Sequence, residues 1–114
     1  MAAKLKCFVI EDEPLATKKI VEYINMSPYL LLVRMVEDIE YPYLLFNDLK
    51  STDILFLDLI VCGGHIESLA EYIRDIRFLV ITSALSKWEY PEFIKKRPHF
   101  ALQNPFLLRC SIHV

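Results

Sequence analysis

The stretch DILFLDLIVCGG, residues 53–64, decides the fold because one acid interrupts an otherwise apolar run. Seven of the eight residues from Ile54 to Val61 are apolar, and the exception is Asp58. A short run that is apolar on both sides indicates a strand of a parallel sheet with helices on both faces. A carboxylate inside such a strand is costly. We therefore expect the strand to end at Asp58, so that the carboxylate emerges at the edge of the sheet and is not buried.

Strand-like and helix-like segments alternate outward from this stretch. Apolar, strand-forming runs are separated by segments that carry helix signals. These signals are apolar residues at helical spacing, a proline in the first turn or acidic capping residues. The first helix follows EDEP and ends at SPYL. This (βα)5 alternation predicts a doubly wound, three-layer α/β sandwich. The predicted strands are 5–10, 30–36, 54–58, 78–84 and 99–103, and the later helices are 40–50, 66–76, 86–97 and the beginning of a fifth from 105 to 114.

Length and composition exclude several classes of protein. The 114 residues suit a single domain, 1–114, and the net charge of −2 leaves no basic surface for nucleic acid or an anionic membrane. No apolar stretch reaches the roughly 18 residues that span a bilayer, and the N-terminus lacks signal-peptide features. Three cysteines, an odd number, fit reduced thiols better than disulfides. We expect a cytoplasmic protein that contacts neither membrane nor nucleic acid directly.

Acidic side chains follow two of the predicted strands. Glu11 and Asp12 come after the first strand, and Asp58 comes at the end of the third. In doubly wound sheets, sites form beyond the carboxyl ends of the strands, so these three carboxylates should converge. Like charges at such distances need a cation, and a hard divalent ion such as Mg²⁺ relieves the repulsion. The pattern predicts a Mg²⁺-assisted phosphoryl site in which a carboxylate can become an aspartyl phosphate.

Four motifs in register carry a resemblance over essentially the whole chain. VIEDEPLA at 9–16, LFLD at 55–58, ITSA at 81–84 and the X-Pro step at 104–105 resemble a response-regulator receiver domain, especially the type that precedes LytTR DNA-binding domains. The resemblance implies a flavodoxin-like fold with strand order 2-1-3-4-5 and a short last helix. Each motif alone is weak, but the four together are fairly specific.

The resemblance also implies roles for individual residues. Glu11 and Asp12 would hold Mg²⁺, and Asp58 would be both phosphoacceptor and metal ligand. The backbone carbonyl of Ile60 would complete the coordination. Ser83 would be the hydroxyl that bonds the phosphoryl group, with Thr82 as the alternative if the register is shifted by one.

Three positions depart from the family pattern. Asn104 stands where the family has a lysine that pairs with the phosphoryl oxygens, and a neutral hydrogen bond there would stabilise the phosphorylated state by about 1 to 2 kcal/mol less. Ala101 occupies the aromatic switch position, although Phe100 is adjacent. Cys62 replaces a proline. With the shortened last helix and no output domain in the chain, these departures indicate a degenerate receiver or a fragment of a longer regulator.

Simpler interpretations exist for the same residues. Glu11, Asp12 and Glu13 could be ordinary helix caps before a first-turn proline. Asp58 could bond its own loop, and Ser83 could close a strand as a small polar residue. Two C-x-x-H pairs, at 62–65 and 110–113, have a spacing that zinc can use, but they belong to different elements of the sandwich.

Three functional hypotheses follow. The first is a receiver that takes a phosphoryl group from a histidine kinase or phosphotransfer protein onto Asp58 and signals through the face of the fourth helix, fifth strand and fifth helix. It is a switch and not a turnover enzyme. The second is a pseudo-receiver that works as an interaction or dimerisation module without phosphorylation. The third, a small phosphatase-like or nucleotide-binding enzyme, is disfavoured because no Gly-rich phosphate loop follows the first strand. Self-association through the shortened last helix is a further expectation.

Overall fold

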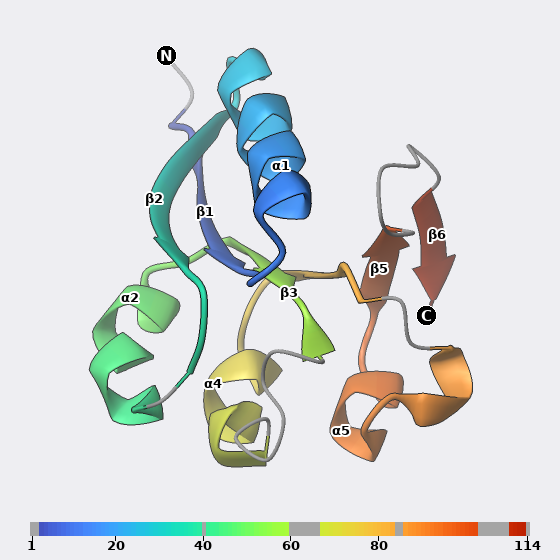
Figure 1. Ribbon diagram of the computed structural model, residues 1–114. Helices are drawn as coiled ribbons and strands as arrows, with labels where there is room; N and C mark the ends of the chain where they lie inside the picture. The colour runs from blue at the N-terminus through green and yellow to red at the C-terminus, as the bar shows by residue number, and fades with distance from the viewer. Residues whose placement is uncertain (1–2, 40, 60–66, 84–85, 103–109, 114) are drawn as a thin grey trace.

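A computed structural model describes residues 3–39, 41–59, 67–83, 86–102 and 110–113 of the chain. Strands and helices alternate along it (Figure 1). The strands are β1 (Leu5–Ile10), β2 (Leu30–Val36), β3 (Ile54–Leu57), β4 (Phe78–Ile81), β5 (His99–Leu102) and β6 (Cys110–His113). The helices are α1 (Pro14–Met26), η1 (Pro42–Leu45), α2 (Phe46–Lys50), α4 (Ala70–Arg74), η3 (Lys87–Glu89) and α5 (Glu92–Lys95).

The sheet confirms the predicted topology. Its strand order is β2-β1-β3-β4-β5-β6, and the neighbours among β1 to β5 all pair in parallel. The order 2-1-3-4-5 with intervening helices is the flavodoxin-like α/β arrangement. The reversal of strand order lies between β1 and β3, so the carboxyl ends of these two strands flank the expected position of a site.

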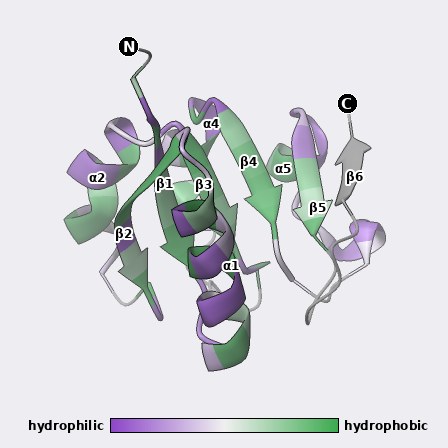
Figure 2. Cartoon of the chain, turned by 90° about the horizontal axis from the view of Figure 1, so that it is seen from above, coloured by the Kyte–Doolittle hydropathy of each residue, from purple (hydrophilic) through white to green (hydrophobic). Residues whose placement is uncertain are grey.

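Two clusters of buried side chains hold the layers together. On one face, Ile20 and Ile24 of α1 cover Cys7 and Val9 of β1. The helices α2, α4 and α5 lie on the other face (Figure 2). Their apolar side chains pack over alternate residues of β1, β3 and β4. The central strands β1, β3 and β4 are apolar on both faces because both faces are covered. The second and larger cluster contains Phe8, Ile10, Ile39, Leu45, Leu49, Leu55, Leu57, Leu59, Leu69, Ile73, Ile76, Leu79, Ile81, Tyr90 and Ile94.

Two predicted helices are divided. The segment predicted as one helix over 40–50 begins with the 3-10 turn η1 and continues as α2. The segment predicted over 86–97 is split into η3 and α5, because Tyr90 and Pro91 are both extended, with ψ of 142° and 148°. Proline disfavours the helical conformation of the residue before it, and this restriction separates the two short helices. The helix predicted over 66–76 appears as the shorter α4.

The prediction of a fifth helix from 105 to 114 is wrong for residues 110–113. Cys110–His113 form β6, which pairs antiparallel with β5, with Phe100 opposite Ile112. Without β6, the backbone groups on one side of β5 would be left at a sheet edge. The pairing with β6 satisfies those groups. Apolar periodicity over so short a segment could not reveal this pairing.

None of the helices in the described segments is long and apolar enough to cross a membrane.

Candidate metal and phosphoacceptor site

The carboxyl ends of β1, β3 and β4 are aligned by backbone hydrogen bonds. The amide of Asp58 donates to the carbonyl of Ile10 at 3.0 Å, and the amide of Thr82 donates to the carbonyl of Leu57 at 3.0 Å. The residues that follow these three strands therefore leave the sheet side by side. This alignment brings together residues 11–12, 58 and 82–83, which are far apart in the sequence.

Three carboxylates meet at this edge. Glu11, Asp12 and Asp58 each offer an oxygen, and these oxygens all lie within 4.8 Å of one another. Glu11 is 0% exposed and Asp58 is 5% exposed, whereas Asp12 is open to solvent. The convergence that the sequence predicted is present, but the expectation that Asp58 emerges unburied is wrong. Leu59, which is also buried, follows Asp58 and continues the large apolar cluster, so the chain does not turn outward there.

Two hydroxyls from the end of β4 compensate the buried carboxylates. Ser83 donates its hydroxyl hydrogen to Oδ1 of Asp58 at 2.7 Å and accepts a hydrogen bond from the amide of Leu59. Thr82 donates from Oγ1 to Oε1 of Glu11 at 3.2 Å. Ser83 is thus the hydroxyl that contacts Asp58, while Thr82 serves a different carboxylate. The sequence predicted Thr82 only as an alternative to Ser83. The alternation of side chains along a strand does not show which carboxylate each hydroxyl will bond.

Burial dominates the electrostatics of Glu11. The pKa of Glu11 is raised to about 8, first by desolvation and then by the hydrogen bond and negative charge of Asp58. The amide of Glu13 and the hydroxyl of Thr82 act in the opposite direction but are weaker. The second carboxylate oxygen of Glu11 accepts hydrogen bonds from the amides of Asp12 and Glu13 at 3.1 and 3.3 Å. Without a cation, Glu11 therefore holds a proton at neutral pH.

Capping is the role of Glu13 alone among the three consecutive acids. Its carboxylate accepts hydrogen bonds from the amides of Leu15 and Ala16 at 3.3 and 2.7 Å, at the start of α1. Pro14 occupies the first helical position, where a missing amide hydrogen costs nothing. The simpler interpretation therefore holds for Glu13, while Glu11 and Asp12 face Asp58.

The three carboxylates fit a small divalent cation. Mg²⁺ binds oxygen ligands at about 2.0–2.1 Å, so two ligands on opposite sides of one ion are about 4.2 Å apart. Oxygens within 4.8 Å of one another reach this geometry by a small contraction. The donor set contains only hard oxygen atoms, which suits Mg²⁺ or Mn²⁺ and not a thiolate-seeking metal. A cation here would stabilise the charged forms of the buried carboxylates, so Glu11 would release its proton when the ion binds.

Two other predicted site residues, Ile60 and Asn104, lie outside the described residues, as does Cys62. Ala101 is described, and it lies in β5 in register with Ile81. Phe100 is in register with Val80, so it points to the other face of the sheet. Phe100 therefore does not replace the aromatic side chain missing at position 101.

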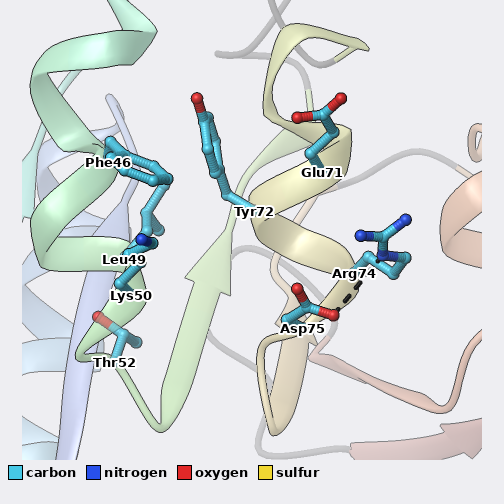
Figure 3. Close-up of a pocket in the computed structure, with 8 residues that line it drawn as sticks. All are labelled: Phe46, Leu49, Lys50, Thr52, Glu71, Tyr72, Arg74 and Asp75. Atoms are coloured by element: carbon cyan, nitrogen blue, oxygen red, sulfur yellow. Dashed lines mark ion pairs between the residues drawn. The ribbon is translucent and has the colours of Figure 1, made fainter.

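A separate cavity of about 260 Å³ lies between α2 and α4, away from the carboxylates. Figure 3 shows Phe46 and Tyr72 facing each other across it, with their ring centres 4.6 Å apart. Lys50 lies over the ring of Phe46 at 4.3 Å, and Arg74 pairs with Asp75 at 3.6 Å. The cavity carries both signs of charge and has no residue in common with the acidic cluster.

The comparisons with known proteins concern the chain as a whole. No protein-family model and no curated protein matches the chain. A solved structure, the solution structure of the BeF3-activated conformation of SdrG from Pseudomonas melonis Fr1, is similar with a TM-score of 0.64. The sequences are 25% identical, and the match covers 95% of this chain and 90% of that chain. The fold and the acidic cluster at the ends of β1 and β3 together make this chain a receiver-like domain with a site that resembles a phosphoacceptor site.

Proposed function

We propose that this chain is the receiver of a signalling pathway and accepts a phosphoryl group on Asp58. The observation that carries the proposal is the meeting of Glu11, Asp12 and Asp58 at one edge, with Ser83 bonded to Asp58. The likeness to a protein that BeF3 activates supports it. The domain would act as a cytoplasmic switch and not as a turnover enzyme. Its relation to LytTR-type regulators stays a prediction from the sequence motifs.

The proposed transfer uses one carboxylate oxygen of Asp58 as the nucleophile. A new O–P bond forms as the P–N bond of a phosphohistidine donor breaks, and the departing imidazole nitrogen takes up a proton. Mg²⁺ held by Glu11, Asp12 and Asp58 would neutralise charge on the transferred oxygens. Ser83 would donate its hydroxyl hydrogen to the phosphoryl group in place of the present bond to Asp58. The donor would be a histidine kinase or a phosphotransfer protein.

A small phosphodonor tests this proposal directly. Incubation with acetyl phosphate and Mg²⁺ should add one phosphoryl group to the intact protein, as measured by mass spectrometry. The adduct should be lost with hydroxylamine, which cleaves acyl phosphates, and should not form on Asp58→Asn. The matched control is Asp53→Asn, which removes a carboxylate five residues earlier and should still be labelled. An adduct that persists in Asp58→Asn would contradict the proposal.

A phosphorylation-independent pseudo-receiver is the second candidate. Ala101 favours it, because Phe100 points to the opposite face and no aromatic side chain occupies the switch position in β5. Such a module would bind partners in one conformation. If the protein forms no phosphoryl adduct and Mg²⁺ does not change its thermal stability, the results would favour the pseudo-receiver.

A further inference from the structure

Thr82 carries a buried hydroxyl group that the proposed phosphoryl transfer does not use. The residue is 5% exposed, and its Oγ1 donates to Oε1 of Glu11 at 3.2 Å. The amide of Thr82 donates to the carbonyl of Leu57 at 3.0 Å, so β3 fixes the backbone that carries the hydroxyl. A threonine side chain is stiff at χ1 because it is branched at Cβ. The hydroxyl that meets Glu11 is therefore held in place by the sheet.

Glu11 is bonded at both carboxylate oxygens. Oε2 accepts hydrogen bonds from the amides of Asp12 and Glu13 at 3.1 and 3.3 Å, and Oε1 accepts the bond from Thr82. The two amides belong to the segment that directly follows Glu11, whereas Thr82 comes from the end of a different strand, β4. Glutamate is among the side chains that lose most rotamer freedom when they are ordered. The bond from Thr82 ties this long side chain to the edge of the sheet.

We propose that Thr82 is a positioning residue for the divalent cation, and that its hydroxyl holds Glu11 in the orientation that binds the ion. The proposal rests on the metal site proposed above. Side chains that hydrogen-bond to metal ligands orient those ligands, and their loss typically lowers metal affinity about 10- to 100-fold. A donated hydrogen bond also favours the charged form of a carboxylate, which is the form that binds a cation. Thr82 would contribute in both ways without being a ligand itself.

Thr82 and Ser83 serve different carboxylates. Side chains of consecutive residues point to opposite faces within a strand, but β4 ends at Ile81, and both hydroxyls reach the acidic cluster beyond it. Ser83 bonds Asp58, the proposed phosphoacceptor, and would exchange that bond for one to the phosphoryl group. Glu11 takes no part in the covalent step, so its bond from Thr82 would persist before and after transfer. Loss of the Thr82 hydroxyl should therefore act on metal binding.

Thr52 provides a matched control for the loss of a buried hydroxyl. It is also a buried threonine, 7% exposed, and its Oγ1 donates to the carbonyl of Asp48 at 2.6 Å. Thr52 precedes β3 and Asp58 follows it, so the control lies at the opposite end of that strand from the acidic cluster. Removing either hydroxyl costs a buried hydrogen bond. Only the removal at position 82 should change metal binding.

Magnesium titrations followed by thermal melting test the proposal. For each protein, the rise in melting temperature above its own value in EDTA, measured over a series of Mg²⁺ concentrations, gives an apparent dissociation constant. Thr82→Val keeps the branched shape but removes the hydroxyl, and it should raise this constant about 10- to 100-fold. Thr82→Ser retains a hydroxyl and should bind Mg²⁺ nearly as tightly as the native protein. Thr52→Val should melt at a lower temperature in EDTA and keep the native dissociation constant.

The possible results distinguish the role of Thr82 from the metal site on which it depends. An unchanged dissociation constant in Thr82→Val, an equal increase in Thr52→Val, or no recovery in Thr82→Ser would overturn the role of Thr82 and leave the metal site standing. A native protein that shows no response to Mg²⁺ would refute the metal site, and the role of Thr82 with it. If circular dichroism shows that Thr82→Val is unfolded, Thr82→Ala, which also lacks the hydroxyl, takes its place.

Discussion

At the scale of single residues, the protonation of Glu11 should make the stability of the metal-free protein depend on pH. Its pKa of about 8 lies above the value of 4.5 expected for an unfolded chain. Between these two values the folded protein keeps a proton that the unfolded chain releases. The free energy of unfolding of the metal-free protein should therefore fall as pH rises from about 5 to 8, by at most about 1.4 kcal/mol per pH unit from this group. Urea denaturation in EDTA at several pH values measures this slope.

The variant Asp58→Asn tests the cause of this pH dependence of the free energy of unfolding. It removes the negative charge beside Glu11 while keeping an acceptor oxygen for Ser83. In EDTA at pH 8 we expect the variant to be more stable than the native chain, and at pH 5 the gain should shrink. Asp75→Asn, at a side chain that is 79% exposed, should change neither value. A native stability that rises with pH across this window would contradict the buried, protonated Glu11.

Ser83 joins two buried groups, so its loss should be costly. Ser83→Ala removes the donor to Asp58 and the acceptor for the Leu59 amide. An unsatisfied buried polar group costs about 1 to 3 kcal/mol, and we expect a loss of unfolding free energy in that range. Ser83→Thr keeps the hydroxyl and should recover most of it. Equal stability of the alanine and native proteins in chemical denaturation would refute the hydrogen bonds.

At the scale of elements, α1 begins at a cap that is distinct from the acidic cluster. Glu13→Ala removes the acceptor of two helix amides and should lower the free energy of unfolding by about 0.5 to 2 kcal/mol. Glu13→Gln retains an acceptor oxygen and should lose less. Neither variant should change the response of the melting temperature to Mg²⁺, because Glu13 is not one of the three clustered acids. A lost Mg²⁺ response in Glu13→Gln would contradict this division of roles.

The strands were more predictable than the helices. Runs rich in apolar, strand-forming residues identify β1 and β2 at their observed bounds. The bounds of the helices depend on whether proline or strand pairing prevents a segment from forming a helix. Pro91 holds Tyr90 extended and divides one predicted helix, and pairing with β5 determines the structure of residues 110–113. Such tertiary effects are invisible to local periodicity.

At the scale of the whole molecule, the strand order determines which residues meet at the site. The topology places the ends of β1 and β3 together, which is why Glu11, Asp12 and Asp58 could be predicted to converge from strand ends alone. Burial could not be predicted in the same way. Asp58 is buried where the chain continues into the apolar cluster at Leu59, and Ser83 from the end of another strand bonds its carboxylate.

A divalent ion held by three carboxylates is the central claim, and a melting experiment tests it most directly. The native protein should melt at a higher temperature in millimolar Mg²⁺ than in EDTA, because an ion at 100 times its dissociation constant stabilises the native state by about 2.7 kcal/mol. Asp12→Asn removes the exposed ligand without disturbing the core and should abolish most of the shift, whereas Asp75→Asn should retain it. Equal melting temperatures of the native protein with and without Mg²⁺, or an equal shift in Asp12→Asn, would contradict the claim.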